Sequence, residues 1–267
     1  MATPKITAAI ITFNEEKNIC RCLESLQWVD ELIVVDSFST DRTVELARQY
    51  TDKVLQSTWP GHVLQKQFAL EQATGDWIIS LDADEELSAD AAADIRAALA
   101  AAPLDVNGYS FPRQSFYLKR WIRHGGWYPD RKVRLVRRGH ARWTGQDPHD
   151  KLVAAGRTRD LQGNIFHYVY SDIAHQLRTV DSFSRITAEL WLKKDKRAGL
   201  APMLCKPVAK FFGAYVWKLG LLDGMPGLII SVISAYYVFL KYAKLWELQQ
   251  AKSSGNTKQI TPQIPTV

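Results

Sequence analysis

The first hundred residues alternate between apolar segments of strand length and amphipathic segments of helix length. The strand-like segments are "ITAAIITF", "ELIVVDS", "KVLQST" and "DWIISLD", and the intervening helical segments are "NEEKNICRCLESLQWV", "FSTDRTVELARQY" and "HVLQKQFALEQAT". Repeated βα units of this kind imply a mainly parallel, doubly wound sheet with its site at the carboxyl ends of the strands. Asn14, Asp36 and Asp82 all fall at such ends. The alternation therefore predicts an α/β fold with a polar site along one edge of the sheet.

The fourth strand ends in a concentration of like charge. Residues 75–87, "GDWIISLDADEEL", place Asp82, Asp84, Glu85 and Glu86 within five positions and with no basic residue nearby in the sequence. Carboxylates this close resist ionisation, and a divalent cation held by Asp82 and Asp84 would relieve the repulsion. Oxygen ligands suit Mg²⁺ or Mn²⁺. The alternative is that residues 84–86 form the acidic first turn of the helix in "SADAAADIRAALAAA", which leaves Asp82 unexplained.

The net charge of +6 hides an uneven distribution of charge. Residues 1–105 carry 8 Lys and Arg against 18 Asp and Glu, whereas residues 106–267 carry 26 against 10. The acidic half could hold a cation, and the basic half should prefer phosphates, nucleic acid or an anionic membrane surface. Because no recognisable nucleic-acid-binding motif is present, we do not expect nucleic acid as a partner.

Cysteine usage indicates a reducing compartment. The three cysteines are an odd number, and the N-terminal segment enters a strand without a secretory leader, so reduced thiols in the cytoplasm are expected. Cys20 and Cys22, two apart on an expected helix, point to different sides and are interpreted as packing residues.

From residue 106 the expected strands are "GYSFPRQSFYL", "RKVRLVRR" and "NIFHYVY". Alternation places Lys132 and Arg134 on one strand face, which is either solvated or in contact with phosphates. The chain turns helical after about residue 172. Its most apolar run, "GLIISVISAYYVFL" at residues 227–240, is shorter than the roughly 20 residues that span a bilayer. Flanking lysines and aromatic residues favour an interfacial or re-entrant segment, and a core helix or a full span remain alternatives.

Four segments taken together resemble the family 2 glycosyltransferases. They are "TFNEE", "VVDSFSTDRT", "ATGDWIISLDADEEL" and "QDPHDKL", in this order and spacing. The resemblance implies a GT-A (Rossmann-like) fold and inverting transfer from a nucleotide sugar, with "LDADE" as the DxD motif. "DPHDKL" and the later "LDG..G" segment are similar to the lipopolysaccharide core β-glucosyltransferases. The Gln-x-x-Arg-Trp signature of processive polymer synthases is absent from the sequence.

The resemblance also implies roles for individual residues at the donor site. Asp84 would be a direct metal ligand, and Asp82 would contact the ribose or, through water, the metal. The remaining donor-binding residues implied by the motifs are Thr12, Asn14, Glu15, Asp36, Lys66 and Ala83. Taken singly, Asn14 and Asp36 could be a helix cap and a turn residue, and Lys66 could be an exposed helical lysine.

Inverting transfer is a single displacement and needs a base for the attacking hydroxyl. Asp150 is the predicted base because it occupies the acidic position of the family's His-Glu pair, and Asp147 is the reserve candidate. His149 could orient the acceptor or be structural. His167 could approach the diphosphate or metal, or simply pack in its strand.

The resulting prediction is a hexosyltransferase that moves glucose, or another hexose, from a UDP-linked or similar donor to a lipopolysaccharide-core or other lipid-linked saccharide. Residues 1–105 would bind the nucleotide sugar, 106–175 the acceptor, and 176–250 an anionic membrane surface on the cytoplasmic face; 251–267 would form a disordered tail. The alternatives are a polyprenyl-phosphate sugar transferase of the same fold, a haloacid-dehalogenase-type phosphatase and a non-catalytic sugar-binding module.

Overall fold

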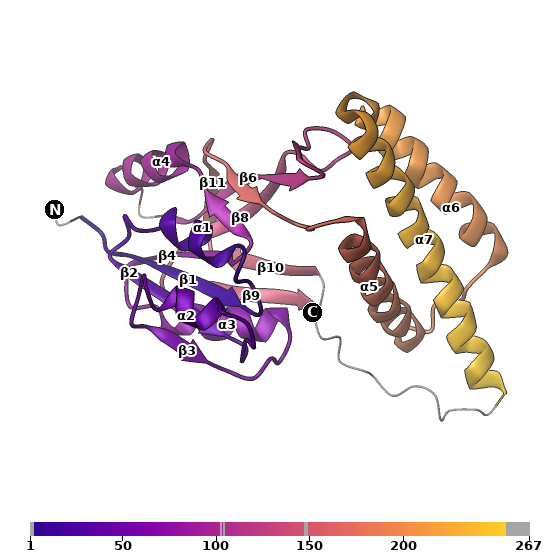
Figure 1. Ribbon diagram of the computed structural model, residues 1–267, viewed down its shortest axis with the longest axis horizontal. Helices are drawn as coiled ribbons and strands as arrows, with labels where there is room; N and C mark the ends of the chain where they lie inside the picture. Colours follow the sequence, from indigo (N-terminus) through magenta and orange to yellow (C-terminus); the bar gives the residue numbers. More distant parts are fainter. Residues whose placement is uncertain (1–2, 102, 104, 147–148, 255–267) are drawn as a thin grey trace. The chain divides into compact units, whose positions relative to one another are not determined.

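A computed structural model describes residues 3–101, 103, 105–146 and 149–254. The chain forms two compact units (Figure 1). Residues 1–115 and 129–169 make up the first, which we call the sheet unit, and residues 116–128 and 170–267 make up the second, the helical unit. Residues 116–128 belong to the helical unit because most of their contacts are with it, although in the sequence they lie between segments of the sheet unit.

The sheet unit begins with the expected alternation of strands and helices. Four parallel strands lie in the order β3-β2-β1-β4. Their bounds are β1 Ile6–Thr12, β2 Glu31–Asp36, β3 Val54–Gln56 and β4 Trp77–Asp82, and the helices between them are α1 Ile19–Glu24, α2 Thr43–Ala47 and α3 His62–Gln72. All seven residues of β1 are buried, as expected for a central parallel strand. The predicted α/β fold is therefore confirmed.

Beyond β4 the sheet becomes mixed and continues as β4-β8-β6-β12-β5. These strands are β5 Glu85–Leu87, β6 Val106–Tyr117, β8 Asp130–Arg137 and β12 Ile165–His167, with β7 Arg120–Trp121 and β11 Arg157–Asp160 also pairing with β6. A separate antiparallel hairpin consists of β9 Ala141–Gln146 and β10 His149–Ala154. Helix α4, Ala89–Ala100, starts at Ser88, whose hydroxyl accepts a hydrogen bond from the Ala91 amide at 3.2 Å.

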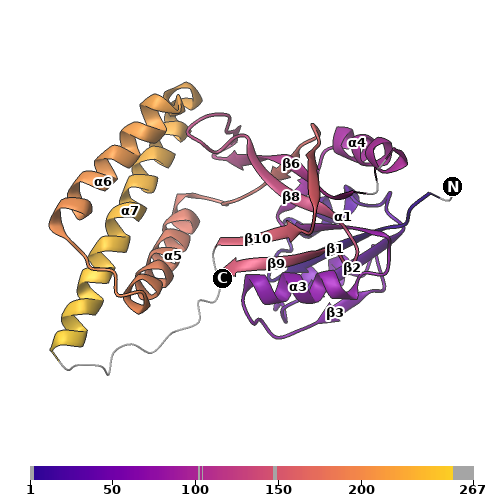
Figure 2. The ribbon, with the colours of Figure 1, turned by 180° about the vertical axis from the view of Figure 1, so that it is seen from behind.

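The two faces of the sheet carry separate apolar clusters, because successive residues of β1 point to opposite sides. Ala8 and Ile10 belong to one cluster, which α1 and α4 cover, while Ala9 and Ile11 belong to the other, which α3 covers. Figure 2 shows α3 and α4 from behind. With both faces covered, the polar residues of these strands are left at the strand ends.

The local structure around the strand ends excludes the alternative raised for the acidic run. The acids of residues 84–86 do not open a helix: Glu85 begins β5, because it pairs with His167 of β12. Helix α2 starts after Arg42 without a side-chain cap, and the nearby Ser39 bonds to Asp36. Helix α3 ends before Ala73, and Gly75 allows close packing: a Cβ there would lie 2.8 Å from the Thr7 hydroxyl oxygen.

In the helical unit, α7 packs against both α5 and α6 (Figures 1 and 2). Its elements are α5 Ile173–Lys193, α6 Leu200–Phe212, the π-helical turn η1 Gly213–Trp217, the 3₁₀ turn η2 Gly220–Asp223 and α7 Gly224–Ser253. The "LDG..G" segment has a packing role here. The buried Asp223 carboxylate accepts the His124 amide at 2.7 Å, and a Cβ on Gly227 would lie 1.9 Å from the Gly220 carbonyl oxygen.

The apolar run 227–240 is part of a longer helix than the sequence suggested. Helix α7 has 30 residues, which corresponds to about 45 Å at 1.5 Å per residue. Gly220–Ser253 is, by length and composition alone, a candidate membrane span, and only 28% of its most apolar window is buried. The apolar run alone is too short to span a bilayer, but the whole helix α7 is long enough. An ordinary core helix would be mostly buried, so the low burial of α7 does not fit that alternative.

Candidate active site

The carboxyl ends of β1, β2 and β4 bring three predicted site residues to one edge of the sheet. Thr12 pairs in register with Asp36, and Ile11 pairs with Asp82. Ala83 follows immediately and is buried, with its amide bonded to the Ile11 carbonyl at 3.2 Å. Neighbouring parallel strands thus gather residues that are up to 70 positions apart in the sequence.

Lys66 joins two predicted site carboxylates. Its ammonium lies 2.8 Å from Asp82 Oδ1 and 2.8 Å from Asp150 Oδ2, and its side chain is only 4% exposed. The alternative of an exposed helical lysine is therefore wrong. Burial is the largest single influence and would raise the pKa of both acids, but the charge and hydrogen bond of Lys66 and the charge of Arg134 together outweigh it and hold the pKa of Asp82 and of Asp150 below the usual range. Both carboxylates are ionised at neutral pH.

A second set of charges explains the dense acidic run at the end of β4. Arg134 donates to Glu85 at 2.8 Å and to Asp82 at 3.2 Å, and Arg113 donates to the same Glu85 oxygen at 3.2 Å. Glu85 is fully buried between these guanidinium groups. The sequence near the acidic run lacks basic residues, and Lys66 of α3, Arg113 of β6 and Arg134 of β8 supply them. The negative charge of Asp82 is therefore compensated without a metal ion. The repulsion within the acidic run does not by itself indicate a metal at Asp82.

This network leads to a stability prediction. Replacing Glu85 by Gln should lower the free energy of unfolding by about 3 kcal/mol, because two largely buried guanidinium groups lose a shared carboxylate. The cost should lie at the lower end of the usual range, since Arg134 keeps Asp82 and Arg113 keeps Asp130. Urea unfolding measures it. Glu45→Gln, which breaks an exposed pair with Arg42, is the control and should leave the free energy of unfolding nearly unchanged; equal losses in the two variants would contradict the interpretation.

Asp84 lies apart from these cations and faces His167. The His167 Nε2 atom is 3.2 Å from Asp84 Oδ2, and both side chains are partly buried. The other ring nitrogen, Nδ1, is buried without a hydrogen-bond partner among the described residues. The Asp84 carboxylate is a suitable ligand for Mn²⁺ or Mg²⁺ when phosphate oxygens complete the coordination, and an imidazole nitrogen suits a transition metal such as Mn²⁺ rather than Mg²⁺. The described residues contain no cluster of three or more His, Cys, Asp or Glu that could hold a metal alone.

Glu15 is an acid at this edge whose pKa is raised, in contrast to those of Asp82 and Asp150. Burial, followed by the nearby charge of Asp84, raises the pKa of Glu15 to about 7. Its carboxylate accepts a hydrogen bond from Asn18 at 2.7 Å, and its amide donates to Thr43 at 2.8 Å. A cation beside Asp84 would favour the ionised form of Glu15, so the two groups respond to the same charge.

The loop after β1 is fastened to the loop after β2. The Asn14 amide donates to Ser39 Oγ at 2.8 Å, and Asn14 Oδ1 accepts the Thr40 amide at 2.8 Å. Asp36 is buried and accepts a hydrogen bond from the Ser39 amide at 3.0 Å. This contact fits the alternative role of Asp36 as a turn residue. The buried Thr12 hydroxyl has no hydrogen-bond partner in the described part of the chain. These contacts preorganise the loops between which Thr12 lies.

Asp150 belongs to the β9–β10 hairpin, where it pairs in register with Gly145. Trp143 of the same hairpin packs its ring against two cations of the site, with Lys66 Nζ 4.7 Å and Arg134 Cζ 5.4 Å from the ring centroid. His149 is exposed, and the reserve base Asp147 lies outside the described residues. Sequence reasoning missed Trp143 and Glu85; a large aromatic residue between Arg142 and Thr144 was the available signal for Trp143.

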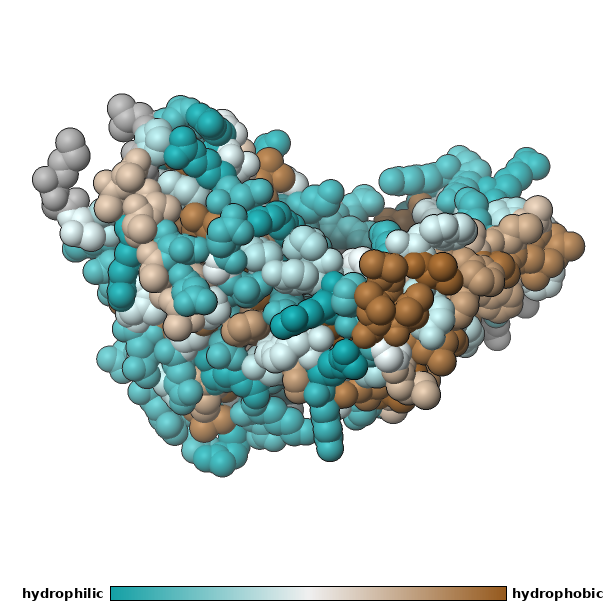
Figure 3. Space-filling view, turned by 90° about the horizontal axis from the view of Figure 1, so that it is seen from above, coloured by the Kyte–Doolittle hydropathy of each residue, from teal (hydrophilic) through white to brown (hydrophobic). Residues whose placement is uncertain are grey.

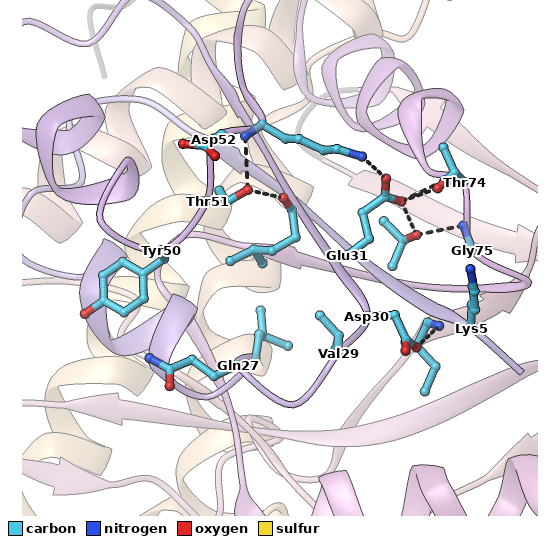
Figure 4. Close-up of a pocket in the computed structure, with 15 residues that line it drawn as sticks. Lys5, Gln27, Val29, Asp30, Glu31, Tyr50, Thr51, Asp52, Thr74 and Gly75 are labelled. Atoms are coloured by element: carbon cyan, nitrogen blue, oxygen red, sulfur yellow. Dashed lines mark hydrogen bonds and ion pairs between the residues drawn. The ribbon is translucent and has the colours of Figure 1, made fainter. Parts of the chain in front are cut away.

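A cavity of about 770 Å³ lies at the opposite ends of the strands. Figure 4 shows Glu31 at its centre, bonded to Thr74 and, in the same network, to Lys53 and Thr7. Its lining includes Ile6 and Glu31, the first residues of β1 and β2, and none of the predicted site residues. Because no predicted site residue lines this cavity and its central acid, Glu31, is already paired with Lys53, it is not the candidate active site.

Comparison with known proteins identifies the family. The model of glycosyl transferase family 2 matches residues 7–158, which is more than half of the chain. The chain belongs to glycosyl transferase family 2. The lipopolysaccharide core biosynthesis glycosyltransferase LpsC of Rhizobium meliloti is 29% identical over 94% of this chain and 95% of LpsC. An uncharacterized glycosyltransferase of Rickettsia felis is 31% identical over 91% of this chain and 90% of that protein.

Among solved structures, the mannosyltransferase PcManGT from Pyrobaculum calidifontis, in complex with GDP-Man and Mn²⁺, has a TM-score of 0.55. At 16% identity over 92% of this chain and 88% of that chain, the likeness shows the fold alone. The family 2 glycosyltransferase thus has the GT-A fold, and the haloacid-dehalogenase alternative is wrong. The family match spans every predicted site residue from Thr12 to Asp150, whereas His167 and nearly all of the helical unit lie outside it.

Proposed function

We propose that this glycosyltransferase moves a hexose, with glucose favoured, from a UDP-linked sugar to a lipopolysaccharide-core or other lipid-linked saccharide with inversion. The observation that carries the proposal is the convergence of Asp82 and Asp150 on Lys66 at one sheet edge of a family 2 domain, with Asp84 two residues beyond Asp82. A catalytically inactive sugar-binding module would have no need for Asp82 and Asp150 to be drawn from separate segments and kept ionised in a partly buried place.

The donor would bind at the carboxyl ends of β1, β2 and β4. Thr12, Asn14, Glu15 and Asp36 would hold the nucleoside, and Asp82 and Ala83 would lie beside the ribose. Asp84 and His167 would hold Mg²⁺ or Mn²⁺ at the diphosphate; when bound, the cation supplies Lewis-acid stabilisation of the leaving diphosphate. The GDP-Man and Mn²⁺ in the PcManGT structure support a cation beside a nucleotide sugar in this fold.

Asp150 would act as the general base. Because Lys66 keeps its carboxylate ionised, Asp150 can accept the proton of the acceptor hydroxyl as that oxygen attacks the anomeric carbon. The same Lys66 contact fixes the carboxylate against Asp82, so the base is held next to the donor site. Trp143, packed on Lys66, would shield this ion pair from water.

The acceptor proposal rests on LpsC, whose name assigns it to lipopolysaccharide core biosynthesis, and on the surface of the helical unit. Helix α6 has no buried residue, and its apolar positions recur every four residues along one face. Exposed apolar side chains of this unit include Leu200, Leu204, Val208, Phe212, Trp217 and Met225. Figure 3 shows apolar residues gathered over the helical unit. We propose that it binds the cytoplasmic face of the membrane, where nucleotide sugars and a lipid-linked acceptor meet.

A donor screen tests the function. We expect release of UDP from UDP-glucose in the presence of Mn²⁺ or Mg²⁺ and a lipopolysaccharide-core acceptor, and a lower rate with GDP-mannose. A polyprenyl phosphate in place of the saccharide acceptor examines the alternative acceptor class. Transfer to polyprenyl phosphate alone would overturn the acceptor proposal, and the absence of release from any nucleotide sugar with any acceptor would overturn the transferase proposal.

A further inference from the structure

Three lysines of the helical unit converge on a buried tyrosine. Lys206 of α6 donates to the Tyr242 hydroxyl at 2.7 Å, and Tyr242 is only 3% exposed. Lys196, from the α5–α6 connection, lies with its Nζ 5.3 Å from the centroid of the same ring. Lys241 of α7 reaches the adjacent Trp191, whose ring centroid is 5.0 Å from that of Tyr242. Residues from three segments therefore place their ammonium groups around the neighbouring, mutually tilted rings of Trp191 and Tyr242.

The rings account for part of this arrangement. Lys196 Nζ lies 3.2 Å from the Trp191 centroid, and Lys241 Nζ lies 4.3 Å from the Tyr237 centroid, so cation–π attraction stabilises each cation singly. It does not remove the repulsion between them. Burial, and then the charges of Lys196, Lys210 and Lys206, lower the pKa of Lys241.

No carboxylate compensates this cluster. Among the residues that the structure describes, Lys196, Lys206, Lys210 and Lys241 form no ion pair with an acid. The contrast with other cations is direct: Lys66 bonds to two aspartates, and Lys244, one turn along α7 from Lys241, bonds to Asp181 at 2.7 Å. Lys196 and Lys241 are partly buried, whereas Lys206 and Lys210 are exposed. A group of neighbouring cations with no acidic partner among the described residues is the arrangement expected of an anion site.

We propose that Lys196, Lys206 and Lys241 form a binding site for a phosphate group, with the Tyr242 hydroxyl as a fourth polar contact and Lys210 adding charge at its margin. A phosphate suits the site because its oxygens can accept from several ammonium groups at once. The proposal deepens the acceptor part of the proposed function, on which it rests for biological context. The phosphate could belong to a soluble phosphorylated saccharide or to a lipid headgroup.

The test removes two charges and keeps the apolar stems over the rings. Lys206→Met/Lys241→Met is compared with Lys193→Met/Lys252→Met, which removes two exposed lysines of the same unit. Calorimetry with inorganic pyrophosphate, without divalent cation or nucleotide, measures binding of a soluble phosphate compound. The first variant should bind about tenfold or more weakly than wild type, because it loses two charge-assisted hydrogen bonds to the phosphate, and the control, which loses none, should match wild type.

Flotation with phosphatidylcholine vesicles, with and without phosphatidic acid, measures the lipid arm. If the first variant loses binding to vesicles but not to pyrophosphate, the ligand is a lipid headgroup. If it also loses binding to pyrophosphate, the site accepts phosphate groups in general. If the first variant unfolds, Lys206→Gln on exposed α6 replaces it. Equal binding of both probes by wild type and the first variant, or no binding by wild type, would overturn the proposal. Asp84→Asn should leave both results unchanged, which separates this site from the transferase reaction.

Discussion

Replacing Asp84 by Asn is expected to lower the rate of sugar transfer by about a thousandfold or more. The physical reason is that the substitution removes one of the two protein groups, Asp84 and His167, proposed to hold the cation at the diphosphate. Losing several kcal/mol of charge stabilisation in the transition state corresponds to a change of this size. The measurement is UDP release with saturating donor and Mn²⁺.

The control for this change is Asp90→Asn, which removes an exposed carboxylate in the first turn of α4. It should retain wild-type turnover. The melting temperature of Asp84→Asn should remain close to that of the wild type, because Asp84 is bonded through its side chain only to His167 among the contacts seen here. Near-normal turnover in a folded Asp84→Asn protein would contradict the proposal that Asp84 binds the metal ion.

Replacing Asp150 by Asn should lower kcat by about a hundredfold or more while donor binding stays nearly unchanged. The amide keeps the shape of the side chain and can still accept a hydrogen bond from Lys66, but it cannot take the acceptor proton. Steady-state kinetics and calorimetry with UDP-glucose separate the two effects. Asp160→Asn, on an exposed strand, is the control.

The pH profile gives a second readout for the base. Because Lys66 holds the pKa of Asp150 below the ordinary value for aspartate, the acid limb of the wild-type rate attributable to Asp150 should appear only below about pH 4. If Asp147→Asn shows the loss of kcat without loss of donor binding, and Asp150→Asn does not, the base is Asp147 and the present assignment is wrong.

The edge on which the site lies was predictable because it depends on local patterns. Apolar segments of strand length that each end in a polar residue place Thr12, Asp36 and Asp82 together once the strands are parallel. The charge compensation was not predictable. Glu85 is bonded to Arg113 and Arg134, which are 28 and 49 residues away, and only the antiparallel additions of β6 and β8 bring them to β4.

The helical unit shows a different limit. Residues 116–128 join it through the bonds from the amides of Arg123 and His124 to Asp223, which are about 100 residues apart, and no periodicity reports such a contact. The length of α7 was underestimated because only its apolar part was counted. Pro226 in the first turn is compatible with a helix start, and the lysine- and glutamine-rich end continues the helix because these residues have high helix propensity.

The central claim is that the carboxyl edge of the sheet is a cation-dependent site for a nucleotide sugar. Calorimetric titration of the wild-type protein with UDP-glucose, once with Mn²⁺ and once with chelator, tests it most directly and needs no acceptor. We predict binding at least about tenfold tighter with Mn²⁺, because a divalent cation neutralises the repulsion between the diphosphate and Asp84, which has no Lys or Arg partner among the described residues. Equal affinity under the two conditions would contradict the claim.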